Sequence, residues 1–99
     1  MDRETVMEAA RRASECAYAP YSHFYVGAAI LTAGGKIHSG SNIENASYGL
    51  SICAERNAAT TMAYADPEDR HIELVAVHST NASPCFLCGA CRQFLREFG

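Results

Sequence analysis

The sequence predicts an α/β fold in which helices cover a mixed β-sheet, and three observations favour it. Segments of helical and strand character alternate along the chain. A glycine pair separates two of the expected strands, as a hairpin turn would. The 99 residues contain no repeat and no linker, which fits a single small domain over residues 1–99. A three-layer α/β/α sandwich, or a two-layer relative of it, satisfies these observations.

Three segments have helical character. Residues 5–19 carry apolar side chains on one side at helical spacing and are followed by Pro20, and Cys16 would be a packed thiol on this helix. Residues 53–65 are rich in Ala and contain no Gly or Pro, which predicts a largely buried second helix. Residues 88–98 are expected to form a third helix.

Three further segments are expected to be strands. Residues 24–32 form a nearly continuous apolar run and residues 36–42 a more polar one. Gly34-Gly35 lies between them, and the freedom of glycine at positive φ suits a hairpin turn. Residues 72–78 have the β-branched and apolar content of a buried strand. The predicted order is helix, strand, strand, helix, strand, helix.

Charge and composition narrow the function classes. The net charge is −3 and the 8 Lys and Arg are scattered, so the basic surface of a nucleic-acid binder is missing. No apolar run approaches the length of a membrane span, and the first residues are too polar for a signal peptide. We therefore expect a cytoplasmic protein that acts on a small molecule. In a reducing compartment, cysteines that recur at positions 85, 88 and 91 indicate metal binding or catalysis rather than disulfide bonds.

Cys53, Cys88 and Cys91 are the candidate zinc ligands. Cys53 and Cys88 stand at the starts of predicted helices, where the helix dipole favours thiolates, and residues 88 and 91 share a helix face. Three protein ligands leave the fourth tetrahedral position open for water, as in catalytic zinc sites. Glu55, two residues after Cys53, is placed to move protons. Cys-x-Glu followed by Pro-Cys-x-x-Cys is typical of zinc nucleobase deaminases.

Five blocks of sequence carry a more specific resemblance. They are Tyr18-Ala19-Pro20-Tyr21-Ser22-His23-Phe24, Val26-Gly27-Ala28-Ala29, Ser41-Asn42-Ile43-Glu44-Asn45-Ala46, Cys53-Ala54-Glu55-Arg56 and Cys88-Gly89-Ala90-Cys91-Arg92-Gln93. On these blocks the chain resembles the homotetrameric class of zinc-dependent cytidine deaminases almost from end to end. The resemblance implies a cytidine-deaminase-like fold, one Zn²⁺ per chain, and a homo-oligomer, either tetramer or dimer.

The resemblance also implies how substrate is held. Asn42 and Glu44 should bind the ribose hydroxyls, and residues two apart on an extended segment do point the same way. Phe24 should pack against the base, and Tyr48 is a further candidate contact. The backbone of Ala54 and the carboxylate of Glu55 should recognise the pyrimidine edge. Arg56 should donate to the ligand sulfurs, since three thiolates leave the zinc centre negative.

The chain departs from this family pattern in two places. Leu87 stands where relatives have Pro, and the preceding Pro84-Cys85 creates a second Pro-Cys-x-x-Cys, so Cys85 and Cys88 are an alternative ligand pair. We favour Cys88 and Cys91 because Gly-Ala-Cys-Arg-Gln continues in the family's phase. Relatives also continue beyond the third helix, so we expect a fold shortened at its C-terminus.

The predicted function is hydrolytic deamination of cytidine and deoxycytidine in pyrimidine salvage, with release of ammonia. Two alternatives stay open. Cys85 could complete a structural zinc site, giving a zinc-stabilised interaction module with little or no catalysis. A related deaminase could instead act on another nucleoside that contains cytosine.

Overall fold

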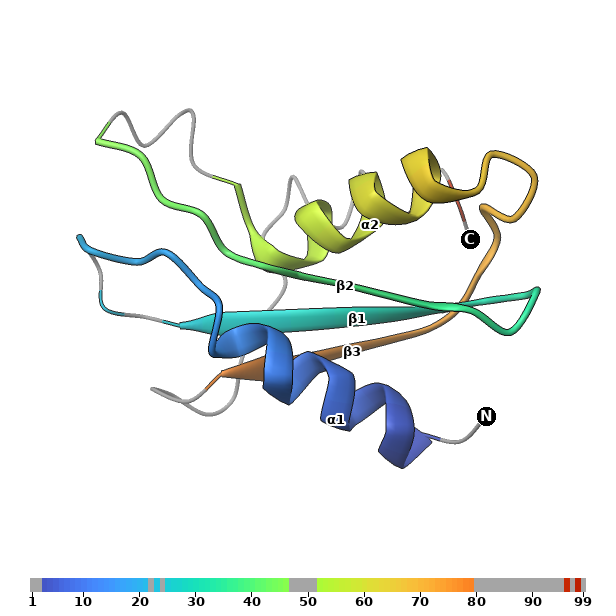
Figure 1. The fold of residues 1–99 in the computed structure, drawn as a ribbon, viewed down its shortest axis with the longest axis horizontal. Coiled ribbons are helices and arrows are strands. Elements are labelled where there is room, and N and C mark those ends of the chain that lie inside the picture. The colour runs from blue at the N-terminus through green and yellow to red at the C-terminus, as the bar shows by residue number, and fades with distance from the viewer. Residues whose placement is uncertain are drawn as a thin grey trace.

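The computed structural model describes residues 3–21, 23, 25–46, 52–79, 96 and 98. Its elements in chain order are α1 (Arg3–Ser14), β1 (Val26–Thr32), β2 (Ile37–Ser41), α2 (Ala54–Ala65) and β3 (Ile72–Ser79). The strands form a sheet in the order β2-β1-β3. Figure 1 shows α1 on one face of this sheet and α2 on the other. The predicted three-layer α/β/α architecture is therefore confirmed.

The described part of the sheet is antiparallel, and the mixed sheet that the sequence predicts stays a prediction for the complete sheet. Within the described residues, β1 pairs antiparallel with both β2 and β3. The chain crosses from β2 through α2 to β3, so these two strands run in the same direction, but β1 lies between them and separates them. Among the described residues, Tyr18 and Ile43 form a parallel bridge, which lies outside the three strands.

β1 is the central strand and is buried on both faces. Alternate side chains of a strand point to opposite faces, and the two core clusters follow this rule. Ala28 and Ile30 pack with α2, whereas Ala29 packs with α1. Small residues let both helices approach closely. A Cβ on Gly27 would lie 2.0 Å from the carbonyl oxygen of Ala10, so any side chain there would have to displace α1.

Helix α1 ends at Ser14, earlier than the predicted residue 19. The backbone that follows turns away and pairs elsewhere, since the Tyr18 N–H donates to the carbonyl of Asn42 over 3.0 Å. Tertiary pairing thus overrides the helical periodicity of residues 15–19. Cys16 lies beyond the helix and is exposed, so its expected packed position is wrong.

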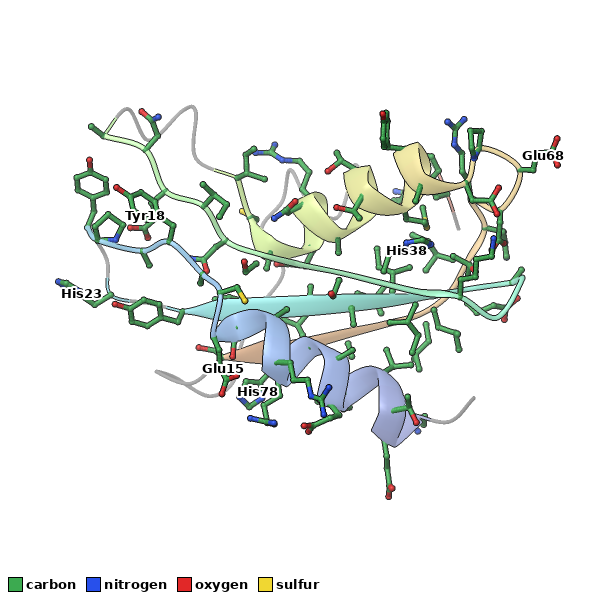
Figure 2. The ribbon with its side chains drawn as sticks, viewed as in Figure 1. Glu15, Tyr18, His23, His38, Glu68 and His78 are labelled. Atoms are coloured by element: carbon green, nitrogen blue, oxygen red, sulfur yellow. The ribbon has the colours of Figure 1, made fainter. Side chains whose placement is uncertain are left out.

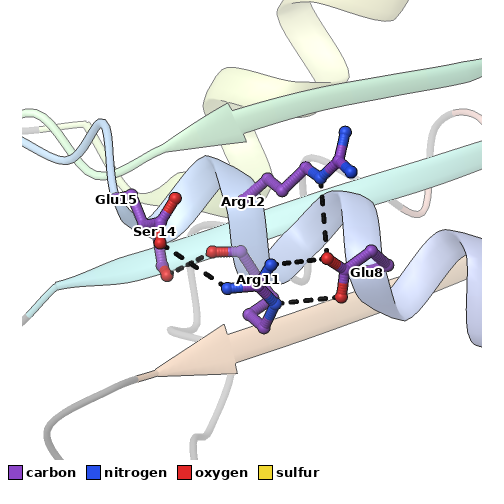
Figure 3. Close-up of polar contacts among 5 residues, drawn as sticks. All are labelled: Glu8, Arg11, Arg12, Ser14 and Glu15. Carbon is purple, nitrogen blue, oxygen red and sulfur yellow. Dashed lines mark hydrogen bonds and ion pairs between the residues drawn. The ribbon is translucent and has the colours of Figure 1, made fainter.

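The exposed face of α1 is held by ion pairs around Glu8 (Figure 3). Both carboxylate oxygens of Glu8 accept from Arg11, at 2.9 and 2.5 Å, and Arg12 lies 3.5 Å from the same side chain. The hydrogen bond from Arg11 lowers the pKa of Glu8 to about 2. Such pairs at helical spacing stabilise an exposed helix modestly.

The other predicted elements agree with the structure to within a few residues. Gly35 has φ of +84° in the turn between β1 and β2, which confirms the glycine hairpin. The predicted third helix, residues 88–98, lies outside the described residues except for positions 96 and 98. Phe98 packs against the core beneath α2, and its carbonyl accepts from the Ile72 N–H over 2.8 Å. None of the described helices has the length and apolarity needed to span a bilayer.

Candidate active site

Cys53 occupies the N-cap of α2. Its backbone is extended, with φ −74° and ψ 153°, and its carbonyl accepts the first helical bond from the Asn57 N–H over 2.9 Å. The side chain is half-buried. A thiol at this place stands beside the unpaired N–H groups of a helix N-terminus, an environment that favours the thiolate needed of a metal ligand.

Glu55 lies in the first turn of α2 and is only 4% exposed. Burial raises the pKa of its carboxyl, and a hydrogen bond that the carboxylate accepts from the backbone N–H of Glu55 opposes this effect in part. Within the described ranges no salt bridge reaches this carboxyl. A thiol at a helix N-terminus and a buried acid two residues later are the kinds of group that a catalytic zinc site combines. Among the described residues no group of three or more His, Cys, Asp or Glu is placed to bind a metal, since the other predicted ligands lie outside them, so the complete zinc site stays a prediction.

Asn42 and Glu44 follow directly after β2 and face the segment that leads into β1. Oδ1 of Asn42 accepts from the Val26 N–H over 2.9 Å, and Oε1 of Glu44 accepts from the Tyr21 N–H over 3.0 Å. Because a backbone N–H can only donate, the first bond fixes which end of the Asn42 amide faces Val26. Both predicted sugar-binding side chains are thus oriented by backbone groups.

Two sets of hydrogen bonds join the segment that contains Asn42 and Glu44 to the start of α2, where Cys53 and Glu55 lie. Ile43 lies between Asn42 and Glu44, and it exchanges backbone bonds of 2.9 and 2.8 Å with Ile52, the residue before Cys53. The Asn57 side chain donates to the carbonyl of Ser41 over 2.8 Å, which ties the first turn of α2 to the end of β2. Residues distant in sequence therefore meet at one end of the sheet.

Sequence reasoning missed Asn57, whose amide joins α2 to β2. Its polarity was no distinguishing signal, because the same helix also contains Glu55, Arg56, Thr60 and Thr61. It also missed the backbone amides of Tyr21 and Val26, which no sequence pattern marks, because any residue other than proline supplies an N–H.

For the remaining predicted site residues, the structure gives burial only or no description. Ala54, the first residue of α2, is buried in the core, and the contact of its backbone with a base stays a prediction. Arg56 is half-buried in the same turn, and its contact with ligand sulfurs stays a prediction. Phe24, Tyr48, Cys88 and Cys91, together with the alternative ligand Cys85, lie outside the described residues.

A groove of about 750 Å³ lies elsewhere, between α1 and β2. The described residues that line it include Glu8, Arg12, Cys16 and Ile37, and none of them is a predicted site residue. The chemistry of the cysteines and Glu55, rather than this hollow, therefore locates the candidate site.

Known proteins match the whole chain. The family model described as the cytidine and deoxycytidylate deaminase zinc-binding region matches residues 1–99. A cytidine deaminase from Halalkalibacterium halodurans is 47% identical over 98% of this chain and 72% of its own length. A probable cytidine deaminase from Dictyostelium discoideum is 46% identical over 97% of this chain and 65% of its own length.

Solved structures agree with these matches. The crystal structure of cytidine deaminase from Burkholderia pseudomallei superposes with a TM-score of 0.89 at 48% identity. The match covers 100% of this chain and 78% of the other. The chain thus spans roughly two thirds to four fifths of the proteins that it matches.

Proposed function

This chain belongs to the zinc-binding cytidine and deoxycytidylate deaminase family, and on that premise we propose that it deaminates cytidine and deoxycytidine. Water and the nucleoside give uridine or deoxyuridine and ammonia. The observation that supports the proposal is the Ile43–Ile52 bridge, which pairs the backbone between Asn42 and Glu44 with the residue that precedes Cys53. A sugar-binding pair next to a thiol and a buried acid is what a nucleoside deaminase requires.

Glu55 is the proton carrier in this proposal. Its carboxylate takes a proton from the attacking water as the new carbon–oxygen bond forms at the amine-bearing ring carbon. It delivers this proton to the ring nitrogen, which gives a tetrahedral adduct that carries both the new hydroxyl and the amine. It then takes the remaining proton of that hydroxyl and delivers it to the amine, so the carbon–nitrogen bond breaks, the new carbonyl forms and ammonia leaves. Burial, which raises the pKa of this carboxyl, suits a group that must hold a proton between the two transfers. Zinc, when bound, supplies Lewis acidity toward the attacking water.

Cys53, Cys88 and Cys91 are the proposed ligands of one Zn²⁺ per chain. Arg56 donates to their sulfurs and offsets the negative charge of three thiolates. Asn42 and Glu44 bind the sugar hydroxyls, Phe24 and Tyr48 contact the nucleoside, and the Ala54 backbone recognises the base. The half-buried place of Cys53 at a helix N-terminus and the orientation of Asn42 and Glu44 support this assignment.

The wider setting is also proposed. The enzyme works in pyrimidine salvage in the cytoplasm, where thiols stay reduced, and as a homo-oligomer, a tetramer or dimer. Size-exclusion chromatography with light scattering measures the oligomeric state directly. A monomer that is fully active would contradict the oligomer.

A substrate panel tests the activity. Zinc-loaded protein is mixed with cytidine, deoxycytidine and free cytosine, and the change in ultraviolet absorbance is followed. We expect turnover of both nucleosides and little of free cytosine, because Asn42 and Glu44 would lose their partner. Turnover of neither nucleoside, with one zinc fully bound, would favour the zinc-stabilised interaction module. Turnover only of another cytosine nucleoside would favour the related deaminase.

Two cysteine variants decide the ligand register. Cys85→Ser should keep zinc, whereas Cys91→Ser should lose it, when bound metal is measured by elemental analysis after dialysis. The reverse outcome would assign the pair to Cys85 and Cys88. Loss of zinc in both variants would indicate a structural site with four thiolates.

A further inference from the structure

The segment between α1 and β1 supports both side chains proposed to hold the sugar. The Tyr21 N–H donates to Glu44, and five residues later the Val26 N–H donates to Asn42. The backbone of Tyr18 adds two bonds, since its N–H donates to the Asn42 carbonyl over 3.0 Å and its carbonyl accepts from the Glu44 N–H over 2.8 Å. The path of this segment therefore decides whether Asn42 and Glu44 keep their orientation.

His23 lies between Tyr21 and Val26 and has an unusual backbone. Its φ is +58°, and among the described residues it is the one with positive φ that is not glycine. Its N–H donates to the carbonyl of Ala19 over 3.0 Å, which closes a five-residue turn. The imidazole is exposed and projects outward at the end of the molecule (Figure 2).

The left-handed conformation has a cost, because Cβ then approaches the following carbonyl oxygen. Residues with a β-branch pay the most, and Gly and Asn the least. A disfavoured conformation persists only where the surrounding contacts require it. Here the required contacts are the amides on either side, which reach Glu44 and Asn42.

We propose that His23 is a positioning residue for nucleoside binding, acting through its left-handed backbone. In this proposal its left-handed conformation, at a point between Tyr21 and Val26, keeps both of their amides directed at the two sugar-binding side chains. The inference rests on the proposed function, since Asn42 and Glu44 are there the sugar ligands. The imidazole itself contacts no substrate in this proposal, so any residue that accepts positive φ can replace it.

Three variants test the proposal in the zinc-loaded full chain. His23→Val forces a β-branched residue into the left-handed region, and His23→Gly removes the strain. Gly35→Val is the matched control, because Gly35 has φ of +84° in the distant hairpin turn and a Cβ there meets nothing within 4 Å. It forces the same β-branched residue into positive φ away from the site, and the added strain is at least as large, because Gly35 has no Cβ to begin with.

We expect His23→Val to raise the KM for cytidine by about 5- to 30-fold, since the binding-competent arrangement becomes less populated. Its kcat should stay within about threefold of wild type, because Glu55 and the cysteines are untouched. His23→Gly and Gly35→Val should leave KM within about twofold. Hydrogen exchange of the Tyr21 and Val26 amides should accelerate in His23→Val alone.

Three results would overturn the proposal. An equal rise in KM in His23→Gly would assign the effect to the imidazole. An equal rise in Gly35→Val would assign it to general instability. Unchanged KM and unchanged amide exchange in His23→Val would show that the backbone conformation positions nothing. A wild-type chain that does not deaminate cytidine would instead refute the proposed function, and amide exchange would still decide whether His23 holds the two amides.

Discussion

Gly40 on β2 sets how closely α2 approaches the sheet. A Cβ at this position would lie 2.5 Å from the backbone nitrogen of Ala58 and 2.9 Å from the carbonyl carbon of Asn57. Both atoms belong to helix backbone, which cannot rotate away as a flexible side chain can. The substitution Gly40→Ala must therefore displace α2, the helix that carries Glu55 and is capped by Cys53.

The size of the displacement follows from these distances. To restore an ordinary contact of 3.4 Å at Ala58, the helix must retreat by about 0.9 Å. Overpacking of this kind costs about 1–3 kcal/mol of stability. A misplacement of about 1 Å between reacting groups can reduce the rate by about 100-fold. We therefore expect kcat/KM for cytidine to fall by about 100-fold, because Glu55 moves relative to Asn42 and Glu44.

The assay measures kcat/KM per folded, zinc-loaded molecule, with urea unfolding on the same samples. Gly27→Ala is a steric control on the opposite face, where a Cβ would lie 2.0 Å from the carbonyl oxygen of Ala10 in α1. It should lose at least as much stability but keep kcat/KM within about fivefold, since α1 carries no proposed site residue.

Gly34→Ala is a milder control, because its Cβ would also approach to 2.5 Å, but against the side chain of Asp69. It should leave kcat/KM unchanged. The reasoning would be refuted if Gly40→Ala retained full activity per folded molecule. It would also be refuted if both control variants lost activity to the same degree, because the loss would then follow instability rather than the place of α2.

Three further predictions concern single side chains. Asn57→Ala removes the bond to the Ser41 carbonyl, and we expect a loss of about 1 kcal/mol and a fall in kcat/KM of about tenfold, measured by urea unfolding and cytidine turnover. Glu55→Gln should abolish turnover and yet raise the Tm of the metal-free protein at pH 8. Burial raises the pKa of Glu55, so its ionised form reduces the stability of the folded protein. The Tm gain of Glu55→Gln should therefore disappear as the pH falls below the ordinary pKa of a Glu carboxyl. An equal Tm gain at every pH would contradict this explanation. Asp66, whose pKa the hydrogen bond from Lys36 lowers, contributes stability that is lost as the pH falls through that lowered pKa. Asp66→Asn should therefore flatten the acid side of the Tm profile, by about 2 °C or less because the pair is exposed.

The elements that the sequence predicted well are those that local chemistry determines. The glycine hairpin and the Ala-rich helix after Cys53 were placed to within one or two residues, because propensity and turn chemistry act at short range. The three-layer arrangement also followed, since β1 is apolar on both faces and needs cover on each.

The elements predicted poorly depend on contacts between distant segments. The helical pattern continues through residues 15–19, but the backbone of Tyr18 pairs with residues 42 and 44 instead, so α1 stops at Ser14. The antiparallel placement of β3 beside β1 depends on a crossover that no local pattern specifies. Because the helix stops at Ser14, Cys16 lies beyond it and is exposed, and the expectation of a packed thiol was wrong.

The candidate site shows the same division. Cys53 and Glu55 could be proposed from spacing alone, because metal and acid chemistry require particular side chains. The amides of Tyr21 and Val26, which orient Glu44 and Asn42, have no side-chain signal at all. The left-handed backbone of His23 could not be predicted either, because glycine is the residue that usually marks positive φ in a sequence.

Reversible removal of zinc tests the central claim most directly. Cytidine turnover is followed by ultraviolet absorbance on the 99-residue chain before chelation, after complete removal of the metal, and after one equivalent of Zn²⁺ is restored. We predict that turnover disappears with the metal and returns with it in wild type, and that Glu55→Gln regains the metal without regaining turnover. Deamination that continues in the metal-free chain, or a fully zinc-loaded wild type that leaves cytidine unchanged, would contradict the account.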